Sequence, residues 1–445
     1  MEPQRPRGGF AGSPGETYTR APMLDRLSAW SGGTVVRRRE LWWLAGAMAL
    51  GLALRVAYVL VTQDHPLGVD ELDYDESGRF AAEGRWLWFT PPYNEPHPSL
   101  WKAPGYPAWV GLVYTLIGPG PNKVIALQTL LGPAVILMTW TLARRLFGPR
   151  AALAAATVSA VYPHLWQWEA SLHPEAFALP LALLFYLTVL GREPTPRRAA
   201  VAGLLLGLSL LVRPTSGALL ALPAVAWWVS QGTRRGLGLA AATAAVGVLV
   251  VAPWTIRNAV VHDAFVPISV QDAAIYGTFN DDAARDPVYP WAWRAGVRRD
   301  LDVYATPRSD VALRTELQSR AFQYIREHPS SVPKAFFWNG LVRTWDVWRP
   351  SRVLNQTRYD GRVRRVEMAA LVMYWALLAL ALAGLWRHRR RRDLVAGVLA
   401  LALASSVLFT IAAATRYRVP FEPLIVVLAC SLLARPRVGA EPVPS

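Results

Sequence analysis

The chain has 445 residues, of which 53% are hydrophobic and 20 are tryptophan, and its formal net charge is +16. Several uncharged apolar runs reach or approach the roughly 20 residues that a helix needs to cross a bilayer, which argues against a soluble protein. The positive charge is not gathered with aromatic residues in a compact basic domain, so the sequence does not predict nucleic-acid binding. The single cysteine, Cys430, excludes an intramolecular disulfide and a cysteine-based metal site.

The N-terminal residues 1–36 are rich in Pro, Gly, Ser and Arg, and they are predicted to form a disordered cytoplasmic tail. The apolar run from Leu41 is too long for the hydrophobic region of a signal peptide and is not followed by a small-residue cleavage site. It is therefore predicted to be an uncleaved first span. Including it, the predicted spans are 41–62, 124–143, 151–164, 175–190, 199–212, 217–231, 237–253, 367–386, 394–413 and 419–434.

Clusters of arginine predict the orientation of these ten spans. If the spans alternate in direction, six basic clusters fall on one side of the membrane, and the positive-inside rule makes that side cytoplasmic. Both termini are then cytoplasmic, and the protein is predicted to be a multi-pass protein of the plasma (inner) membrane. The clusters are Arg37 to Arg39, Arg144 to Arg150, Arg192 to Arg198, Arg234 with Arg235, Arg387 to Arg392, and Arg435 with Arg437.

The spans divide the chain into a membrane module at 37–253, an outer segment at 254–366, C-terminal membrane helices at 367–434 and a cytoplasmic tail at 435–445. The membrane module includes the first outer loop, 63–123. Two helices are expected in that loop, at Tyr74 to Gly84 and at Tyr106 to Ile117, and the second is too short to span. In the outer segment, Asp310 to Glu327 is predicted to be a helix that stops before Pro329.

Two acids lie at the mouth of the membrane domain, in the stretch Val69-Asp70-Glu71-Leu72-Asp73-Tyr74-Asp75. Most acids in loops are only solvated, but ionisable groups held against a membrane are costly and are often functional. Transfer of a sugar needs a base for the acceptor hydroxyl, and a partly desolvated carboxylate with a raised pKa suits that role. Asp70 and Tyr74 share a helix face if the helix begins early.

Several cations are predicted at the same surface. Lys102, in the sequence Lys102-Ala103-Pro104-Gly105-Tyr106-Pro107, is either a lysine that snorkels to the interface or a clamp for a lipid phosphate, whose charge grows as a sugar departs. Arginine suits phosphate through its planar fork, although one arginine at the outer end of a span is more often an anchor. The arginines at outer ends are Arg213, Arg257, Arg416 and Arg418. Arg55 lies within the first span and is read as snorkelling outwards.

A metal site is not predicted. His173 with Glu175 could contribute two ligands, but a site needs more ligands than these. Phosphate-binding Gly-rich loops and a Gly-x-Ser-x-Gly elbow are absent, and no predicted cytoplasmic loop is long enough to fold as a nucleotide-binding domain. A sugar donor would therefore arrive through the membrane or from outside, which favours a lipid-linked sugar.

The motifs resemble those of the GT-C glycosyltransferases, and in particular bacterial glycosyltransferase family 39, which is related to protein O-mannosyltransferases and to the aminoarabinose transferase of lipid A. The resemblance extends from about residue 41 to 434 and rests on the order and spacing of several stretches. They are Asp70-Glu71 with Tyr74, Lys102 to Pro107, Ala143 to Gly148, Val212 to Thr215, Pro253 to Asn258, Tyr324 to Pro329 and Arg416 to Pro420.

The resemblance implies an all-α polytopic membrane protein with the GT-C fold, with interfacial helices in the first outer loop. It implies an inverting transfer, at the outer face, from a polyprenyl-phosphate sugar to a lipid, glycan or protein acceptor, without an obligatory metal or other cofactor. Asp70 would be the base, with Glu71 beside it, and Lys102 would hold the carrier phosphate. Tyr74, Tyr106, Arg213, Arg257, Arg416 and Arg418 are the further candidates for substrate binding.

Two other classes of function stay open at this point. The first is a transporter or flippase for lipid-linked envelope precursors, although such proteins usually show internal repeats and broken central helices. The second is a non-catalytic membrane scaffold, which would give no reason for acids and cations to collect on one face. Transfer of the sugar would release the carrier phosphate, whereas transport would move the carrier intact.

Overall fold

A computed structural model describes residues 36–90, 95–294, 309–358, 360–412 and 414–434. The first part of the chain forms α2 (Arg38–Thr62), α3 (Val69–Ala82), the antiparallel strands β1 (Trp88–Phe89) and β2 (His97–Pro98), α4 (Gly105–Ile117), α5 (Pro121–Thr129), α6 (Gly132–Phe147), α7 (Pro149–Val161), the 3-10 turns η1 (Pro163–Leu165) and η2 (Gln167–Ala170), α8 (Glu175–Val189) and α9 (Pro196–Val212). The predicted all-α class is confirmed, since these two-residue strands are the only sheet in the described ranges.

The second part continues with η3 (Pro214–Leu220), α10 (Ala221–His262), η4 (Gln271–Ala274), α11 (Ile275–Thr278), α12 (Asp281–Ala284), α14 (Asp310–Glu327), α15 (Ser331–Ala335), the π-helix η6 (Phe336–Arg343), α16 (Ser351–Gln356), α17 (Arg364–Arg387), α18 (Arg392–Leu408), η7 (Thr415–Phe421), α19 (Glu422–Cys430) and η8 (Ser431–Leu433). The predicted helix Asp310 to Glu327 is confirmed with the same bounds. The Ser309 hydroxyl caps its first turn by accepting from the Ala312 amide.

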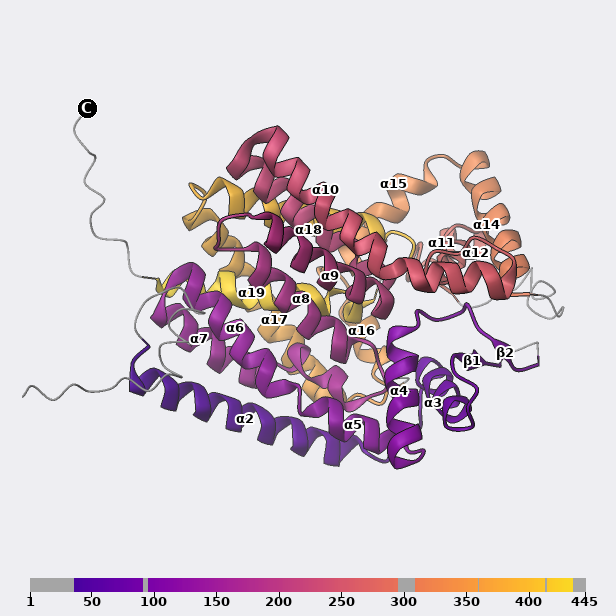
Figure 1. Cartoon of the computed structure of the whole chain (residues 1–445), viewed down its shortest axis with the longest axis horizontal. Helices are drawn as coiled ribbons and strands as arrows, with labels where there is room; N and C mark the ends of the chain where they lie inside the picture. The colour runs from indigo at the N-terminus through magenta and orange to yellow at the C-terminus, as the bar shows by residue number, and fades with distance from the viewer. Residues whose placement is uncertain (1–35, 91–94, 295–308, 359, 413, 435–445) are drawn as a thin grey trace, which may run out of the picture.

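The main core lies between the apolar helices, with α19 at its centre (Figure 1). Every residue of α19 is buried, which explains why this segment is apolar on all sides. Helices α6, α7 and α17 pack around it. The large side chains of Trp140, Tyr162 and Phe185 are fully buried in the same core.

Each of the ten predicted spans contains a helix, but the number that cross a membrane stays a prediction. Within the described part of the chain, four helical stretches are long and apolar enough to span: Arg38–Thr62, Pro121–Phe147, Pro214–His262 and Arg364–Arg387. Several of the other apolar helices are shorter than the roughly 17 residues that a typical span needs.

The predicted spans 217–231 and 237–253 form the two arms of α10, which reverses direction at Gly232. Gly232 has φ 77°, a left-handed conformation that glycine adopts without steric cost. A Cβ at Gly236 would lie 2.3 Å from the Trp227 carbonyl oxygen, so only glycine lets the two arms approach so closely. The second arm continues past Pro253 to His262, nine residues beyond the predicted end.

The two large connecting segments gather at one end of the molecule. Figure 1 shows α3, α4 and the β-hairpin at the same end as α11, α12 and α14, whereas α2 begins at the opposite end. At that opposite end, the Arg391 guanidinium donates to the Leu146 carbonyl at 3.0 Å and the Arg387 guanidinium to the Ala434 carbonyl at 3.2 Å. Basic clusters that are distant in the sequence therefore meet there. The predicted tails 1–36 and 435–445 lie, except for Val36, outside the described residues.

Candidate active site

Helix α3 begins at Val69, five residues earlier than predicted, because Glu71 caps it. The Glu71 carboxylate accepts from the Gly68 amide at 2.8 Å, as the third residue of a capping box does. It also accepts from the Leu172 amide at 3.0 Å and lies 3.2 Å from His65 Nε2. The Glu71 side chain is fully buried, so its carboxylate joins α3 to the loop after η2 and does not face an open site.

Asp70, one residue earlier, is bound by two cations from distant parts of the chain. Its Oδ1 lies 2.6 Å from Lys102 Nζ, and its Oδ2 lies 2.5 Å from a terminal nitrogen of Arg416. The Asp70 side chain is one-third exposed, whereas Lys102 and Arg416 are largely buried. Lys102 also lies 2.9 Å from Asp73 Oδ2, so one ammonium group joins two carboxylates. We call Asp70, Asp73, Lys102 and Arg416 the Asp70 cluster.

The charges of this cluster set the protonation of the two acids. Burial would raise the pKa of Asp70, but the positive charges of Lys102 and Arg416 outweigh burial and hold that pKa well below its usual range. The expectation of a raised pKa at Asp70 is therefore wrong in this structure. Burial does raise the pKa of Asp73, although Lys102 opposes that shift. Asp70 is thus ionised at neutral pH.

The two tyrosines that the sequence analysis proposed for substrate binding pack next to Lys102 in this structure. The Lys102 ammonium lies 5.2 Å from the centre of the Tyr74 ring, close enough for a cation–π contact. Tyr74 packs edge-to-face on Tyr106 with ring centroids 4.8 Å apart, and the Tyr106 hydroxyl donates to Gln128 Oε1 at 3.1 Å. Burial raises the pKa of Tyr74 to about 12, so its hydroxyl stays protonated at neutral pH. Tyr74 therefore packs against Lys102, and Tyr106 holds Tyr74 in place.

Arg213 lies beside the cluster but is already paired. Its guanidinium is 2.7 Å from Glu175 Oε1 and stacks over the Tyr417 ring at 4.6 Å. Arg416 contacts the same ring at 5.4 Å, so Tyr417 separates the two guanidinium groups. The pairing also occupies Glu175, which the sequence offered as a metal ligand with His173. Within the described ranges, no group of three or more His, Cys, Asp or Glu side chains could hold a metal ion.

Two of the predicted arginines are not brought into the cluster. Arg257 lies on the extended end of α10, where it contacts Asn258 at 3.3 Å and stacks over Trp254 at 4.8 Å. Arg418 has other partners than Arg416. It is fully buried and pairs with Asp346 at 2.8 Å and Glu422 at 2.7 Å.

The Arg418 pairs belong to a buried ionic network that the sequence analysis did not predict. His164 lies 3.6 Å from Glu422 and 3.2 Å from Glu367, and Glu367 in turn pairs with Arg362 at 2.5 Å. The network ties η7 to α17, α19 and the loop before α16. It therefore fixes the turn that presents Arg416 to Asp70. Arg55, read from the sequence as snorkelling, is also buried, and it pairs with Glu169 at 2.9 Å.

An open pocket adjoins the cluster on the Lys102 side. Lys102 and Asp73 form part of its wall together with Phe89, Pro107 and Trp254. Its wall combines the Lys102–Asp73 ion pair with apolar surface, so an anionic group that binds there would compete with Asp73 for the ammonium. Trp254 also places Arg257 behind this pocket, through the stacking contact.

Comparisons with known proteins agree with this architecture. A family model described as dolichyl-phosphate-mannose-protein mannosyltransferase matches residues 97–256. That range contains Lys102, Tyr106 and Arg213, whereas Asp70 and Arg416 lie outside it. A search of curated protein sequences finds no match.

Solved structures match over nearly the whole chain. The archaeal oligosaccharyltransferase AglB from Archaeoglobus fulgidus, in complex with an inhibitory peptide and a dolichol-phosphate, aligns with a TM-score of 0.52 and 16% identity over 89% of this chain. The chain therefore shares the fold of this oligosaccharyltransferase. It spans about half the length of this oligosaccharyltransferase, since the match covers 50% of that protein. ArnT from Cupriavidus metallidurans, bound to undecaprenyl phosphate, aligns with a TM-score of 0.40 and 17% identity, over 87% of this chain and 78% of ArnT.

The fold positions the candidate site through the loop between α2 and α5 and through η7. The loop supplies Asp70, Asp73 and Lys102 from α3 and the turn before α4, and η7 supplies Arg416. Asp73 was missed as a site residue, although its position three residues after Asp70 places both on one helix face. The pairing of Asp346 with Arg418 could not be predicted, because no motif in the sequence links these two distant residues.

Proposed function

We propose that this protein is a membrane glycosyltransferase that moves a sugar from a polyprenyl-phosphate carrier to an acceptor at the outer face of the membrane. The observation that carries the proposal is the sharing of Asp70 between Lys102 and Arg416. One carboxylate and two cations, held beside a partly apolar pocket, are the groups that an inverting displacement of a phosphate requires. The match of residues 97–256 to the mannosyltransferase family model supports a relation to family 39.

The proposed reaction needs one proton transfer and one displacement. Asp70 takes the proton of an acceptor hydroxyl as the hydroxyl oxygen attacks the anomeric carbon from the face opposite the phosphate. The bond from that carbon to the phosphate oxygen breaks, and polyprenyl phosphate leaves with the bonding electrons. Lys102 and Arg416 stabilise the negative charge that develops on the phosphate, as fixed cations do for a leaving group.

In this scheme, the carrier phosphate competes with Asp70 for the two cations. When the phosphate binds Lys102 and Arg416, Asp70 shares their positive charge with a second anion, and its pKa rises from the lowered value of the free protein. Binding of the donor would thus make Asp70 a stronger base at the moment when an acceptor needs one. Glu71 contributes by fixing the start of α3.

The phosphate contact is tested by titrating free polyprenyl phosphate. Lys102→Ala and Arg416→Ala should each weaken binding by about tenfold to a hundredfold, because a charge-assisted contact is worth roughly 1.5–3 kcal/mol. The double variant should lose less than the sum, since both cations contact Asp70 and would share one phosphate. Lys334→Ala, which removes an exposed lysine on α15, is the matched control. Wild-type affinity in Lys102→Ala would remove Lys102 from the donor site.

In this proposal, the Asp70 cluster lies at the outer face of the membrane. The meeting of basic clusters near Leu146 and Ala434, at the end opposite α3 and α14, supports this orientation. In a Cys430→Ser background, Glu83→Cys should be labelled on intact cells by an impermeant thiol reagent, whereas Arg389→Cys should react only after the membrane is opened. Labelling of both from the same side would contradict the orientation.

A further inference from the structure

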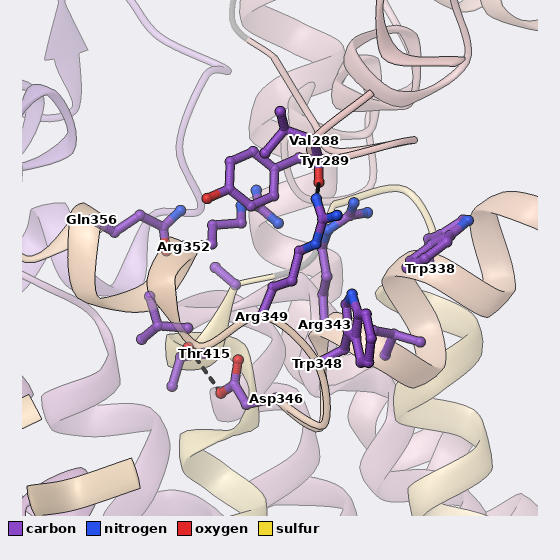
Figure 2. A pocket seen from close by; sticks show the side chains of 13 residues that line it. Val288, Tyr289, Trp338, Arg343, Asp346, Trp348, Arg349, Arg352, Gln356 and Thr415 are labelled. Carbon is purple, nitrogen blue, oxygen red and sulfur yellow. Dashed lines mark hydrogen bonds between the residues drawn. The ribbon is translucent and has the colours of Figure 1, made fainter. Parts of the chain in front are cut away.

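A second pocket reaches Thr415, the residue before Arg416 of the Asp70 cluster. Its walls come from residues 288–289, from η6 and the turn after it, from α16, and from Ala414 and Thr415 (Figure 2). The pocket is an open depression with an enclosed volume of about 20 Å³, so a ligand would lie against its walls and not inside a closed cavity. Thr415 borders it, and the next residue, Arg416, contacts Asp70.

Three arginines line this pocket, and one acid faces them. They are Arg343, Arg349 and Arg352, and the acid is Asp346. The Asp346 carboxylate is already engaged, because its Oδ2 accepts from the Thr415 hydroxyl at 3.0 Å and from Arg418 at 2.8 Å. The pocket therefore carries a net positive charge that its own acid does not neutralise.

The three guanidinium groups differ in how they are held. Arg343 donates to Asn339 Oδ1 at 2.5 Å and to the Pro290 carbonyl, and Arg349 donates to the Val288 carbonyl. Within the described part of the chain, the Arg352 guanidinium makes no hydrogen bond or ion pair and only lies 5.8 Å from the Tyr289 ring centre. Burial lowers the pKa of both Arg343 and Arg352, although the charge of Asp346 opposes the shift at Arg352. Arg352 therefore has free donors for a ligand.

Aromatic rings complete the walls. Tyr289, Trp338 and Trp348 line the pocket beside the arginines, and Trp348 is 59% exposed although it is a large apolar residue. The backbone supports this arrangement at some cost, since Asp346 and Arg349 adopt positive φ values of 44° and 53°. Strained residues that surrounding contacts hold in place often occur at binding sites. Flat aromatic faces suit the apolar face of a sugar ring, and arginine forks suit a carboxylate or phosphate.

We propose that this pocket binds an anionic saccharide, a sugar that carries a carboxylate or a phosphate, and that it is the acceptor subsite. The binding claim stands on the pocket alone, whereas the acceptor role rests on the proposed glycosyltransferase function. The sugar ring packs on the aromatic walls while Arg352 and Arg343 hold its anionic group. Thr415 then lies between the bound sugar and Arg416, which places the acceptor next to the Asp70 cluster.

Saturation-transfer NMR on the purified full-length protein tests the binding claim with three sugar probes, glucose 6-phosphate, glucuronate and glucose, and a parallel competition titration uses inorganic phosphate. Both anionic sugars should bind, and the one that binds more tightly identifies phosphate or carboxylate as the preferred group. Arg352→Gln should weaken that binding at least about tenfold, the loss expected for a charge-assisted contact. The affinity of Arg352→Lys should lie between that of wild type and that of Arg352→Gln, because lysine keeps the positive charge but lacks the planar guanidinium fork. Arg326→Gln, at an exposed position on α14, is the matched control and should bind as wild type does.

Two further variants separate this pocket from the donor site. Asp70→Asn and Lys102→Ala should bind the anionic sugars as wild type does, so a failure of the proposed catalysis would leave this result intact. The proposal is overturned if Arg352→Gln retains full binding, if Lys102→Ala abolishes it, or if glucose binds as tightly as glucose 6-phosphate. Inorganic phosphate that matched the affinity of glucose 6-phosphate would also overturn it, because the site would then recognise only an ion.

Discussion

Asp70→Asn is expected to lower the rate of sugar transfer by about a hundredfold to ten-thousandfold, the range that a positioned general base contributes. The amide keeps the shape of the side chain but cannot accept the proton of the acceptor. It also pairs less strongly with Lys102 and Arg416, which frees both cations for the carrier phosphate. Binding of polyprenyl phosphate should therefore be unchanged or tighter, and single-turnover kinetics with a separate binding titration would show this split.

Asp73→Asn is the matched control, because Asp73 contacts the same lysine. It should retain transfer to within about tenfold, a loss smaller than the loss of a general base. Glu71→Gln should also reduce transfer less than Asp70→Asn, since its effect passes through the start of α3. An inactive Asp73→Asn or Glu71→Gln together with an active Asp70→Asn would reassign the base, and full activity in all three would remove the main support for catalysis.

The second large effect concerns stability. Arg418→Met should lower the free energy of unfolding by about 3–5 kcal/mol, the cost of removing one partner from a buried ion pair. The change leaves Asp346 and Glu422 buried without their shared cation, and it also removes a guanidinium that lies 3.6 Å from the Tyr374 ring centre. Denaturant titration of the purified protein in detergent would measure the loss.

The triple variant Arg418→Met, Asp346→Asn, Glu422→Gln provides the control for this prediction. It removes the uncompensated charges together with the cation, so it should recover part of the lost stability. Equal stability of wild type and Arg418→Met would show that the network contributes nothing to the fold. A loss of donor affinity in Arg418→Met at unchanged stability would instead restore Arg418 to the donor site.

Much of the fold was predictable because its signals are local. Helix α14 has its predicted bounds, since Ser309 caps its start and His328-Pro329 ends it. Helix α4 begins one residue before the predicted Tyr106 and ends at Ile117 as expected. The start of α3 was missed because its cap uses Gly68 and the third-position Glu71, without the Ser, Thr, Asp or Asn that usually marks a cap.

The candidate site was only partly predictable, because its contacts are distant in the sequence. Asp70, Lys102 and Arg416 were identified separately, but the contact between Asp70 and Arg416 joins residues 346 positions apart. The 3-10 turn η7 directs Arg416 to the cluster and Arg418 into the buried network, which one short motif cannot reveal. The lowered pKa of Asp70 follows from these contacts, whereas its position near the membrane alone suggested a raised one.

The central claim is that the sugar leaves its carrier, and release of the carrier measures this most directly. Purified wild-type protein in detergent would be incubated with a polyprenyl-phosphate sugar that is labelled in both the sugar and the lipid, together with a crude envelope extract as the source of acceptor. The account predicts that free polyprenyl phosphate appears in step with labelled sugar on an acceptor, and that Asp70→Asn abolishes both signals. Intact donor after incubation, combined with donor movement across the bilayer when the protein is placed in vesicles, would contradict the account and indicate a transporter.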